Sequence, residues 1–104
     1  KVYKSFCLLK SMEIAEIRAR IDSLDGQLVT LLAQRIELME ALAAYKKAHN
    51  LPIRDLVREK EVIEQRCNQF AAQGHSDPQF TTELFTRIID KCSAVQAAHM
   101  QKAA

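Results

Sequence analysis

The chain of 104 residues has very few of the residues that interrupt helices. Glycine occurs only at Gly26 and Gly74, and proline only at Pro52 and Pro78. The alternation of β-branched and polar residues that is typical of strands is also missing. These absences exclude a β-rich fold and predict an all-α protein. The length and an apolar fraction of 48% fit one domain with a modest core.

Other features are scarce as well, and each absence excludes a class of protein. No apolar run approaches the ~20 residues of a membrane span, and the segment 2–9 is too short for a complete signal peptide. The net charge is only +2, with basic and acidic residues interleaved, so neither nucleic acid nor a membrane surface is an expected partner. Cys7, Cys67 and Cys92 are odd in number and lack metal-ligand spacing, which predicts no metal site and a reducing, cytoplasmic location.

The strongest positive signal is a long apolar stripe with a spacing of three and four residues. Such spacing places the side chains on one face of a single helix, where other helices should cover them. One member is an arginine, which we expect to be buried without a carboxylate beside it on the stripe, so that a ligand could be its partner. The stripe consists of Ile14, Ile17, Ile21, Leu24, Leu28, Leu31, Arg35, Leu38, Leu42 and Tyr45.

The helix that carries this stripe should run from position 12 or 13 to position 47 or 48, where the segment 49–52 stops it. Because Met12 directly precedes the stripe, residues 1–11 are expected to be an extension, a processed remnant or a vector-derived addition, and residues 12–104 the helical domain. A helix of roughly 35 residues is about 52 Å long, whereas a compact domain of this size has a radius of gyration near 13 Å. The remaining helices could not cover its whole apolar face, which predicts a symmetric homodimer.

Two further helices are expected after the long one. Asp55 is the predicted N-cap of a helix that continues to about position 72, with Gly74 suited to the left-handed conformation that follows. Ser76 or Asp77 should cap a third helix, with Pro78 in its first turn and its end near position 101. The predicted protomer therefore has three helices, the first much longer than the others.

Each predicted helix carries a polar side chain on its inner face. Arg35 interrupts the first stripe. Glu59 lies on the apolar face of the second helix, which consists of Leu56, Ile63, Cys67 and Phe70. Gln96 lies within the stripe of the third, which consists of Phe85, Ile89, Cys92 and His99. Lys46 is eleven residues after Arg35, about 16 Å along the axis and on nearly the same side, so a small anion could lie between the two cations. Taken singly, Glu59 could be solvated surface, Gln96 a buried amide, Lys46 a charge that offsets the helix dipole, and Arg35 could reach the solvent.

Together these residues resemble the all-helical chorismate mutases over about residues 13 to 99. The Arg-Asp-x-x-Arg-Glu run and its distances from the other polar residues are specific, whereas any one of them alone would be weak. The resemblance is carried by Ile17 to Asp22, Ser23 to Asp25, Ala33 to Arg35, Lys46, Pro52 to Glu59, Ile88 to Asp90 and Gln96.

The resemblance implies an intertwined homodimer that converts chorismate to prephenate, a step of aromatic amino acid biosynthesis. This Claisen rearrangement needs no metal or organic cofactor and forms no covalent intermediate. By the same likeness, Lys46 and Gln96 would donate hydrogen bonds to the ether oxygen of the substrate. Glu59 would accept one from its hydroxyl, with Asp55 as a further contact.

The likeness also assigns Arg18, Arg35 and Arg58 to the substrate carboxylates, which suit the planar fork of arginine. Arg18 and Lys46 are 28 residues apart, or about 42 Å along one helix, so Arg18 must serve the site of the other subunit. Cys92 stands where many members have a serine near a substrate carboxylate, and a thiol is a much weaker donor. Lower activity or affinity than usual for the family is therefore expected.

Two other functions stay open at the level of sequence. Isochorismate-pyruvate lyases share the fold and a cationic site, but they lack the two acids of the Arg-Asp-x-x-Arg-Glu run, so Asp55 and Glu59 favour the mutase. A helical dimerisation or regulatory module without turnover is the third possibility. The loss of a site cation would have favoured that module, and none is missing.

Overall fold

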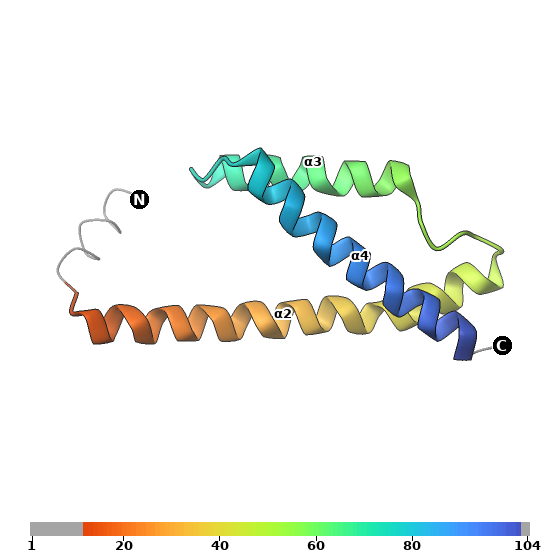
Figure 1. The fold of residues 1–104 in the computed structure, drawn as a ribbon, viewed down its shortest axis with the longest axis horizontal. Coiled ribbons are helices and arrows are strands. Elements are labelled where there is room, and N and C mark those ends of the chain that lie inside the picture. The colour runs from red at the N-terminus through yellow and green to blue at the C-terminus, as the bar shows by residue number, and fades with distance from the viewer. Residues whose placement is uncertain (1–11, 103–104) are drawn as a thin grey trace. The chain divides into compact units, whose positions relative to one another are not determined.

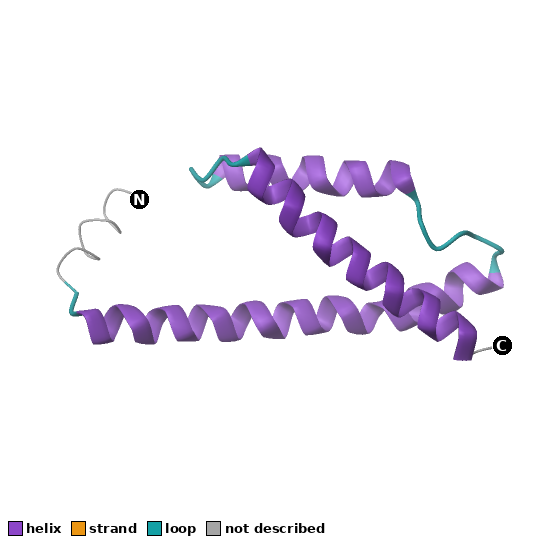
Figure 2. Ribbon diagram, in the orientation of Figure 1, coloured by secondary structure: helices purple, strands orange, loops and turns teal. Residues whose placement is uncertain are grey.

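The computed structural model describes residues 12–102, which form three helices and no strands (Figures 1 and 2). Helix α2 spans Ile14–Ala48, α3 spans Leu56–Ala72 and α4 spans Pro78–Lys102. The predicted all-α class is confirmed, and the predicted boundaries agree to within about two residues. The expectation for residues 1–11 lies outside the described residues. None of the helices in residues 12–102 combines the length and the apolar character that a membrane span requires.

The helices end where the sequence supplies residues that tolerate the left-handed conformation. Asn50 follows α2 with φ 54°, and Gly74 follows α3 with φ 81°. Beyond each of these residues the next N–H donates back into the helix: that of Leu51 to the Lys46 carbonyl at 2.8 Å, and that of His75 to the Phe70 carbonyl at 2.9 Å. This Schellman arrangement satisfies carbonyls that the helix end leaves unpaired.

The starts of α3 and α4 are held by the predicted caps. An Asp55 side-chain oxygen accepts a hydrogen bond from the Arg58 N–H at 3.0 Å, and an Asp77 side-chain oxygen accepts one from the Phe80 N–H at 3.1 Å. Each such cap is worth roughly 1 kcal/mol of stability. With Gly74 before it, the Asp77 cap closes a short turn, and α4 packs along α3.

The chain separates into two compact units, residues 1–35 and 36–104, so that α2 contributes to both. In the described part of the first unit, every residue from 13 to 34 is exposed in the single chain. The six apolar stripe residues of this segment are between 37% and 63% exposed, so the expectation that protein covers them is not met within one chain. They are Ile14, Ile17, Ile21, Leu24, Leu28 and Leu31.

The second unit contains the core. It is built by the last turns of α2 together with α3 and α4, and its buried apolar side chains are Met39, Ala43, Val62, Ile89 and Cys92. The face predicted for the third helix is confirmed, because Ile89, Cys92 and Gln96 are buried while Phe85 and His99 are half-buried. The expectation for Leu56 is wrong, since this residue is 73% exposed at the start of α3, where no described residue covers it.

Candidate active site

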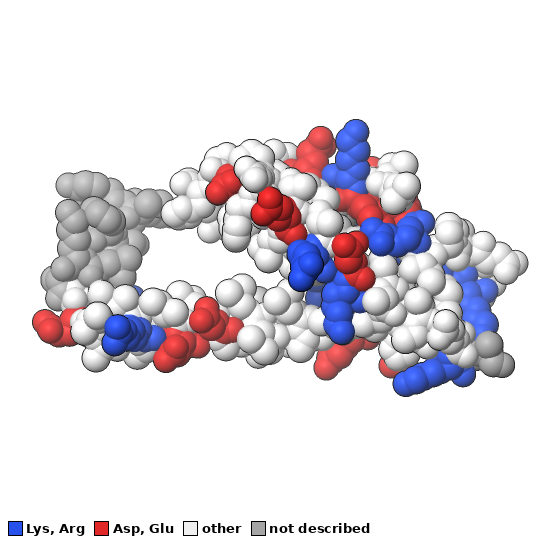
Figure 3. All heavy atoms as spheres, viewed as in Figure 1, with Lys and Arg blue, Asp and Glu red and all other residues white. Residues whose placement is uncertain are grey.

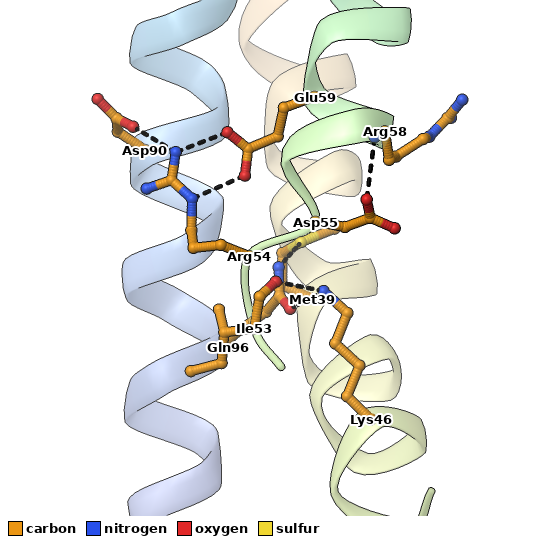
Figure 4. A network of polar contacts seen from close by, with 9 residues as sticks. All are labelled: Met39, Lys46, Ile53, Arg54, Asp55, Arg58, Glu59, Asp90 and Gln96. Atoms are coloured by element: carbon orange, nitrogen blue, oxygen red, sulfur yellow. Dashed lines mark hydrogen bonds and ion pairs between the residues drawn. The ribbon is translucent and has the colours of Figure 1, made fainter. Parts of the chain in front are cut away.

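Two polar side chains that are 50 residues apart in the sequence meet inside the second unit. The Lys46 ammonium in α2 donates to the Gln96 Oε1 atom in α4 at 2.9 Å (Figure 4). It also donates to the carbonyl of Ile53, in the loop between α2 and α3. An ammonium has three N–H donors, so these two acceptors fix its direction and leave a third donor available. The half-buried position of Lys46 makes that donor a suitable partner for an anion or an ether oxygen.

Gln96 is 5% exposed, and both ends of its amide are engaged. Its oxygen accepts from Lys46, while its nitrogen donates to the Met39 sulfur at 3.4 Å. Because an ammonium can only donate, the contact with Lys46 identifies the amide oxygen and thereby the orientation of the amide. A thioether is a weak acceptor, and the Met39 sulfur engages only one of the two N–H groups of the amide. Gln96 is thus a buried amide that bonds across helices and is still able to donate.

Glu59, in the first turn of α3, is held by an arginine that the sequence argument did not single out. Arg54 Nε and one terminal guanidinium nitrogen each donate to a different Glu59 oxygen at 2.7 Å (Figure 4). The same terminal nitrogen lies 3.2 Å from an Asp90 oxygen in α4. Glu59 is half-buried, in agreement with its predicted place on the inner face of the helix.

A hydrogen bond and nearby charges lower the pKa of Glu59. The dominant cause is the hydrogen bond from Arg54, which outweighs the opposing effect of burial. The positive charges of Arg54 and Lys46 act in the same direction, whereas the nearby Asp55 carboxylate acts against them. Glu59 in turn raises the pKa of the Arg54 guanidinium. The Glu59 side chain is therefore an anionic acceptor at neutral pH, as a contact with a substrate hydroxyl requires.

Asp55, Arg58 and Cys92 also belong to this unit. The Asp55 carboxylate caps α3, so one of its oxygens is already bonded to the Arg58 backbone. The Arg58 side chain is exposed and points away from Lys46 and Gln96 in Figure 4. Cys92 is 3% exposed and precedes Gln96 by one helical turn.

The other two predicted arginines lie in the first unit. Arg18 is exposed on α2. Arg35 is half-buried in the single chain, less buried than its place in the stripe predicts, and it has an interaction partner.

The distribution of surface charge and the candidate metal ligands of residues 12–102 were the two remaining features that could mark a binding site. Acidic and basic side chains are interleaved on the face that Figure 3 shows, so this face carries no surface of one sign. Among residues 12–102, no group of three or more histidine, cysteine, aspartate or glutamate side chains could hold a metal ion.

Comparison with known proteins gives the same fold and one family. Residues 17–97 match the sequence model of the family described as chorismate mutase type II. The chain also resembles the solved structure of a conserved hypothetical protein from Pyrococcus furiosus, with a TM-score of 0.64 and 34% sequence identity. That match covers 83% of this chain and 97% of the other.

Three curated relatives differ in length and in name. The bifunctional chorismate mutase/prephenate dehydratase of Escherichia coli K12 is 34% identical over 86 residues, which cover 83% of this chain and 22% of that enzyme. The chorismate mutase of Methanocaldococcus jannaschii is 28% identical over 90 residues, with 86% and 90% covered. The 4-amino-4-deoxychorismate mutase of Streptomyces venezuelae is 30% identical over 90 residues, with 86% of both chains covered. This chain thus spans about a fifth of the bifunctional relatives and most of the two shorter ones.

Proposed function

The chain belongs to the chorismate mutase type II family, and we propose that it converts chorismate to prephenate, with no metal or organic cofactor. The observation that carries this proposal is the contact between Lys46 and Gln96 at 2.9 Å in a partly buried position. Two donors that are held side by side suit a reaction in which negative charge develops on one oxygen. The proposed setting is aromatic amino acid biosynthesis in the cytoplasm, the location being favoured by the odd number and wide spacing of the cysteines.

The reaction is intramolecular: one C–O bond of the substrate breaks while a C–C bond forms, and no group is transferred to the protein. Catalysis must therefore come from holding the flexible substrate in its reactive shape and from stabilising the charge on the ether oxygen. The third N–H of Lys46 and the second N–H of Gln96 are the proposed donors to that oxygen. Both are positioned before the substrate binds, so little reorganisation is needed in the transition state.

The remaining contacts follow from the chemistry of the substrate. Its two carboxylates are proposed partners of Arg18, Arg35 and Arg58, and its hydroxyl donates to Glu59. Asp55 contributes through the oxygen that is not required for the helix cap. Cys92 replaces the more usual serine near a carboxylate, and as a weak donor it is proposed to pack rather than to bind tightly.

A homodimer is the proposed assembly. The support is the exposed apolar stripe: its three members in the second unit are between 37% and 65% exposed, like those of the first unit. Apolar surface of this extent along one helix is unfavourable in water and is typical of an interface. The three residues are Leu38, Leu42 and Tyr45.

We expect sedimentation velocity to give a dimer at micromolar concentration. We also expect urea unfolding to depend on protein concentration, because subunits that need each other's apolar face lose their fold when they separate. Leu28→Glu should weaken the dimer, since it places a charge within the stripe, whereas Gln27→Glu, one position away on the helix, should not. A folded, active monomer at that concentration would refute the dimer.

The site is proposed to be composite, because Arg18 lies 28 residues before Lys46 in the continuous helix α2. Arg18→Ala and Lys46→Ala homodimers should each have little activity. When the two are mixed and exchange subunits, half of the dimers should contain one intact site, restoring about a quarter of the wild-type activity. If subunit exchange is demonstrated by mass spectrometry and no activity returns, Arg18 does not act in the partner's site.

The function itself is tested by incubating the purified protein with chorismate, with isochorismate and with 4-amino-4-deoxychorismate, and identifying the products. Prephenate from the first substrate is the expected main product. Pyruvate from isochorismate would favour the lyase. Preferred turnover of the amino compound would favour the activity for which the Streptomyces venezuelae relative is named. No turnover of any of the three would favour a non-catalytic dimerisation or regulatory module.

A further inference from the structure

Arg54 occupies a position that connects three parts of the second unit. It lies in the loop before α3 and reaches both oxygens of Glu59, in the first turn of α3, at 2.7 Å. Its terminal nitrogen also reaches Asp90 in α4 at 3.2 Å. The adjacent residue, Ile53, accepts the hydrogen bond from Lys46. One loop thus anchors both the ammonium and the carboxylate of the candidate site.

The two hydrogen bonds from Arg54 fix the orientation of the Glu59 carboxylate and leave it able to accept further hydrogen bonds. Each carboxylate oxygen has two lone pairs, and the guanidinium takes one lone pair on each. The remaining lone pairs can accept a hydrogen bond from a ligand. Rotation of the carboxylate would break both contacts with Arg54, so these lone pairs keep a constant direction.

The contact also changes which donors Glu59 favours. The guanidinium offsets the negative charge of the carboxylate, and Lys46 adds a second positive charge in the neighbourhood. Asp90 is 54% exposed and therefore offsets this only weakly through water. A neutral hydroxyl can donate to Glu59 at no electrostatic cost, whereas the attraction of Glu59 and Asp55 for an ammonium is opposed by the positive charges of Arg54 and Lys46.

We propose that Arg54 is a positioning residue that also determines specificity: it holds Glu59 as the acceptor for a neutral substrate hydroxyl and disfavours an ammonium at the same place. This inference rests on the proposed function, because it takes Glu59 as the partner of the substrate hydroxyl. A purely structural role is a poor alternative. The Arg54 side chain is 45% exposed, and ion pairs at that exposure add little to stability.

The test compares chorismate with 4-amino-4-deoxychorismate, whose amino group is protonated near neutral pH. In Arg54→Gln, kcat/KM for chorismate should fall about tenfold, because the Glu59 carboxylate is free to rotate. The ratio of kcat/KM for chorismate to that for the amino compound should shift about tenfold toward the amino compound, which corresponds to ~1.4 kcal/mol.

A pH profile gives a readout that a structural role would not move. The groups that face Glu59 are Arg54 from the loop, Lys46 from α2, Asp55 at the start of α3 and, through Arg54, Asp90 from α4. Arg54 lowers the pKa of Glu59, so its removal raises that pKa. Activity that needs the ionised carboxylate is present above this pKa and is lost below it. The acidic limb of kcat/KM should therefore move to higher pH in Arg54→Gln.

Matched variants separate position from charge. Lys60→Gln removes one positive charge from the exposed residue next to Glu59 and should change neither the substrate ratio nor the acidic limb. Arg54→Lys keeps the charge but loses the bidentate contact, so both readouts should take intermediate values. Asp90→Asn should have a smaller effect than any change at Arg54, because that contact is longer and more exposed.

Each outcome supports or contradicts the proposed role of Arg54. An unchanged substrate ratio and acidic limb in folded Arg54→Gln, with active wild-type protein, would overturn the role of Arg54 while leaving the mutase function in place. Wild-type protein that does not turn over chorismate would overturn the proposed function and this inference with it. If thermal melting shows that Arg54→Gln does not fold, the same two readouts in Arg54→Lys decide, and wild-type values there would overturn the proposal.

Discussion

Lys46→Ala should lower kcat about 10²–10³-fold, the usual effect of removing a donor to a developing oxyanion. The loss should appear in kcat more than in KM, because the ether oxygen carries more negative charge in the transition state than in the bound substrate. In the structure, the ammonium is already fixed by Gln96 and Ile53, so it can meet that oxygen without first being reorganised. Steady-state kinetics with chorismate, read as prephenate formation, measures both constants.

The control for this variant is its neighbour. Lys47→Ala removes the same charge from an exposed position that is rotated by about 100° on the helix, and it should keep near wild-type kinetics. Circular dichroism and thermal melting should show that Lys46→Ala still folds, since it also loses the hydrogen bond to the Ile53 carbonyl. A folded Lys46→Ala protein with wild-type kcat would remove Lys46 from the ether oxygen.

Gln96→Glu should have a comparably large effect, but one that depends on pH. Near neutral pH a carboxylate at this position would repel the negative charge that develops on the ether oxygen, so kcat should be low near pH 7.5. Protonation turns the carboxyl group into a donor, and activity should partly return toward pH 5. The wild-type protein, with an amide at position 96, should show no such requirement for acid.

Two opposing effects decide where that recovery begins. Position 96 is 5% exposed, and burial raises the pKa of a carboxyl group there. The Lys46 ammonium, 2.9 Å from the present Gln96 oxygen, would lower it. Combining Gln96→Glu with Lys46→Ala should therefore raise the pH at which the carboxyl group becomes protonated. This shift can be followed by NMR titration even if the double variant has no activity.

The control is a glutamate placed outside the site. Gln65→Glu adds the same charge at an exposed position of α3 and should leave the pH profile unchanged. A folded Gln96→Glu protein that retains full activity at pH 7.5 would show that Gln96 does not contact the ether oxygen. The assignment of Gln96 as a donor in the site would then be wrong.

The sequence alone predicted the fold class and the helix boundaries, because both depend on residues that are close together along the chain. Asp55 and Asp77 cap helices through hydrogen bonds to N–H groups three residues away. Asn50 and Gly74 end helices through their own backbone conformation. Such local preferences are set by a few neighbouring residues and do not depend on the rest of the molecule.

Part of the candidate site could be predicted for the same reason. The helical period placed Gln96 and Glu59 on inner faces, where the structure has them buried and half-buried. The period also marked Arg35 as a stripe residue, but it could not show that the side chain is only half-buried and already has a partner. A helical period gives the direction of the Cβ atom, not the position of a charged group at the end of a long side chain.

Only the tertiary structure decided which polar groups meet. Lys46 and Gln96 are 50 residues apart, Arg54 and Asp90 are 36 apart, and Met39 and Gln96 are 57 apart. The sequence did not indicate a role for Arg54, because this residue lies in a loop, where no helical period predicts the direction of a side chain. The orientation of the Gln96 amide and the bidentate hold on Glu59 depend on how α2, α3 and α4 pack, since hydrogen bonds between helices form only after apolar burial has brought their donors and acceptors within about 3 Å of each other.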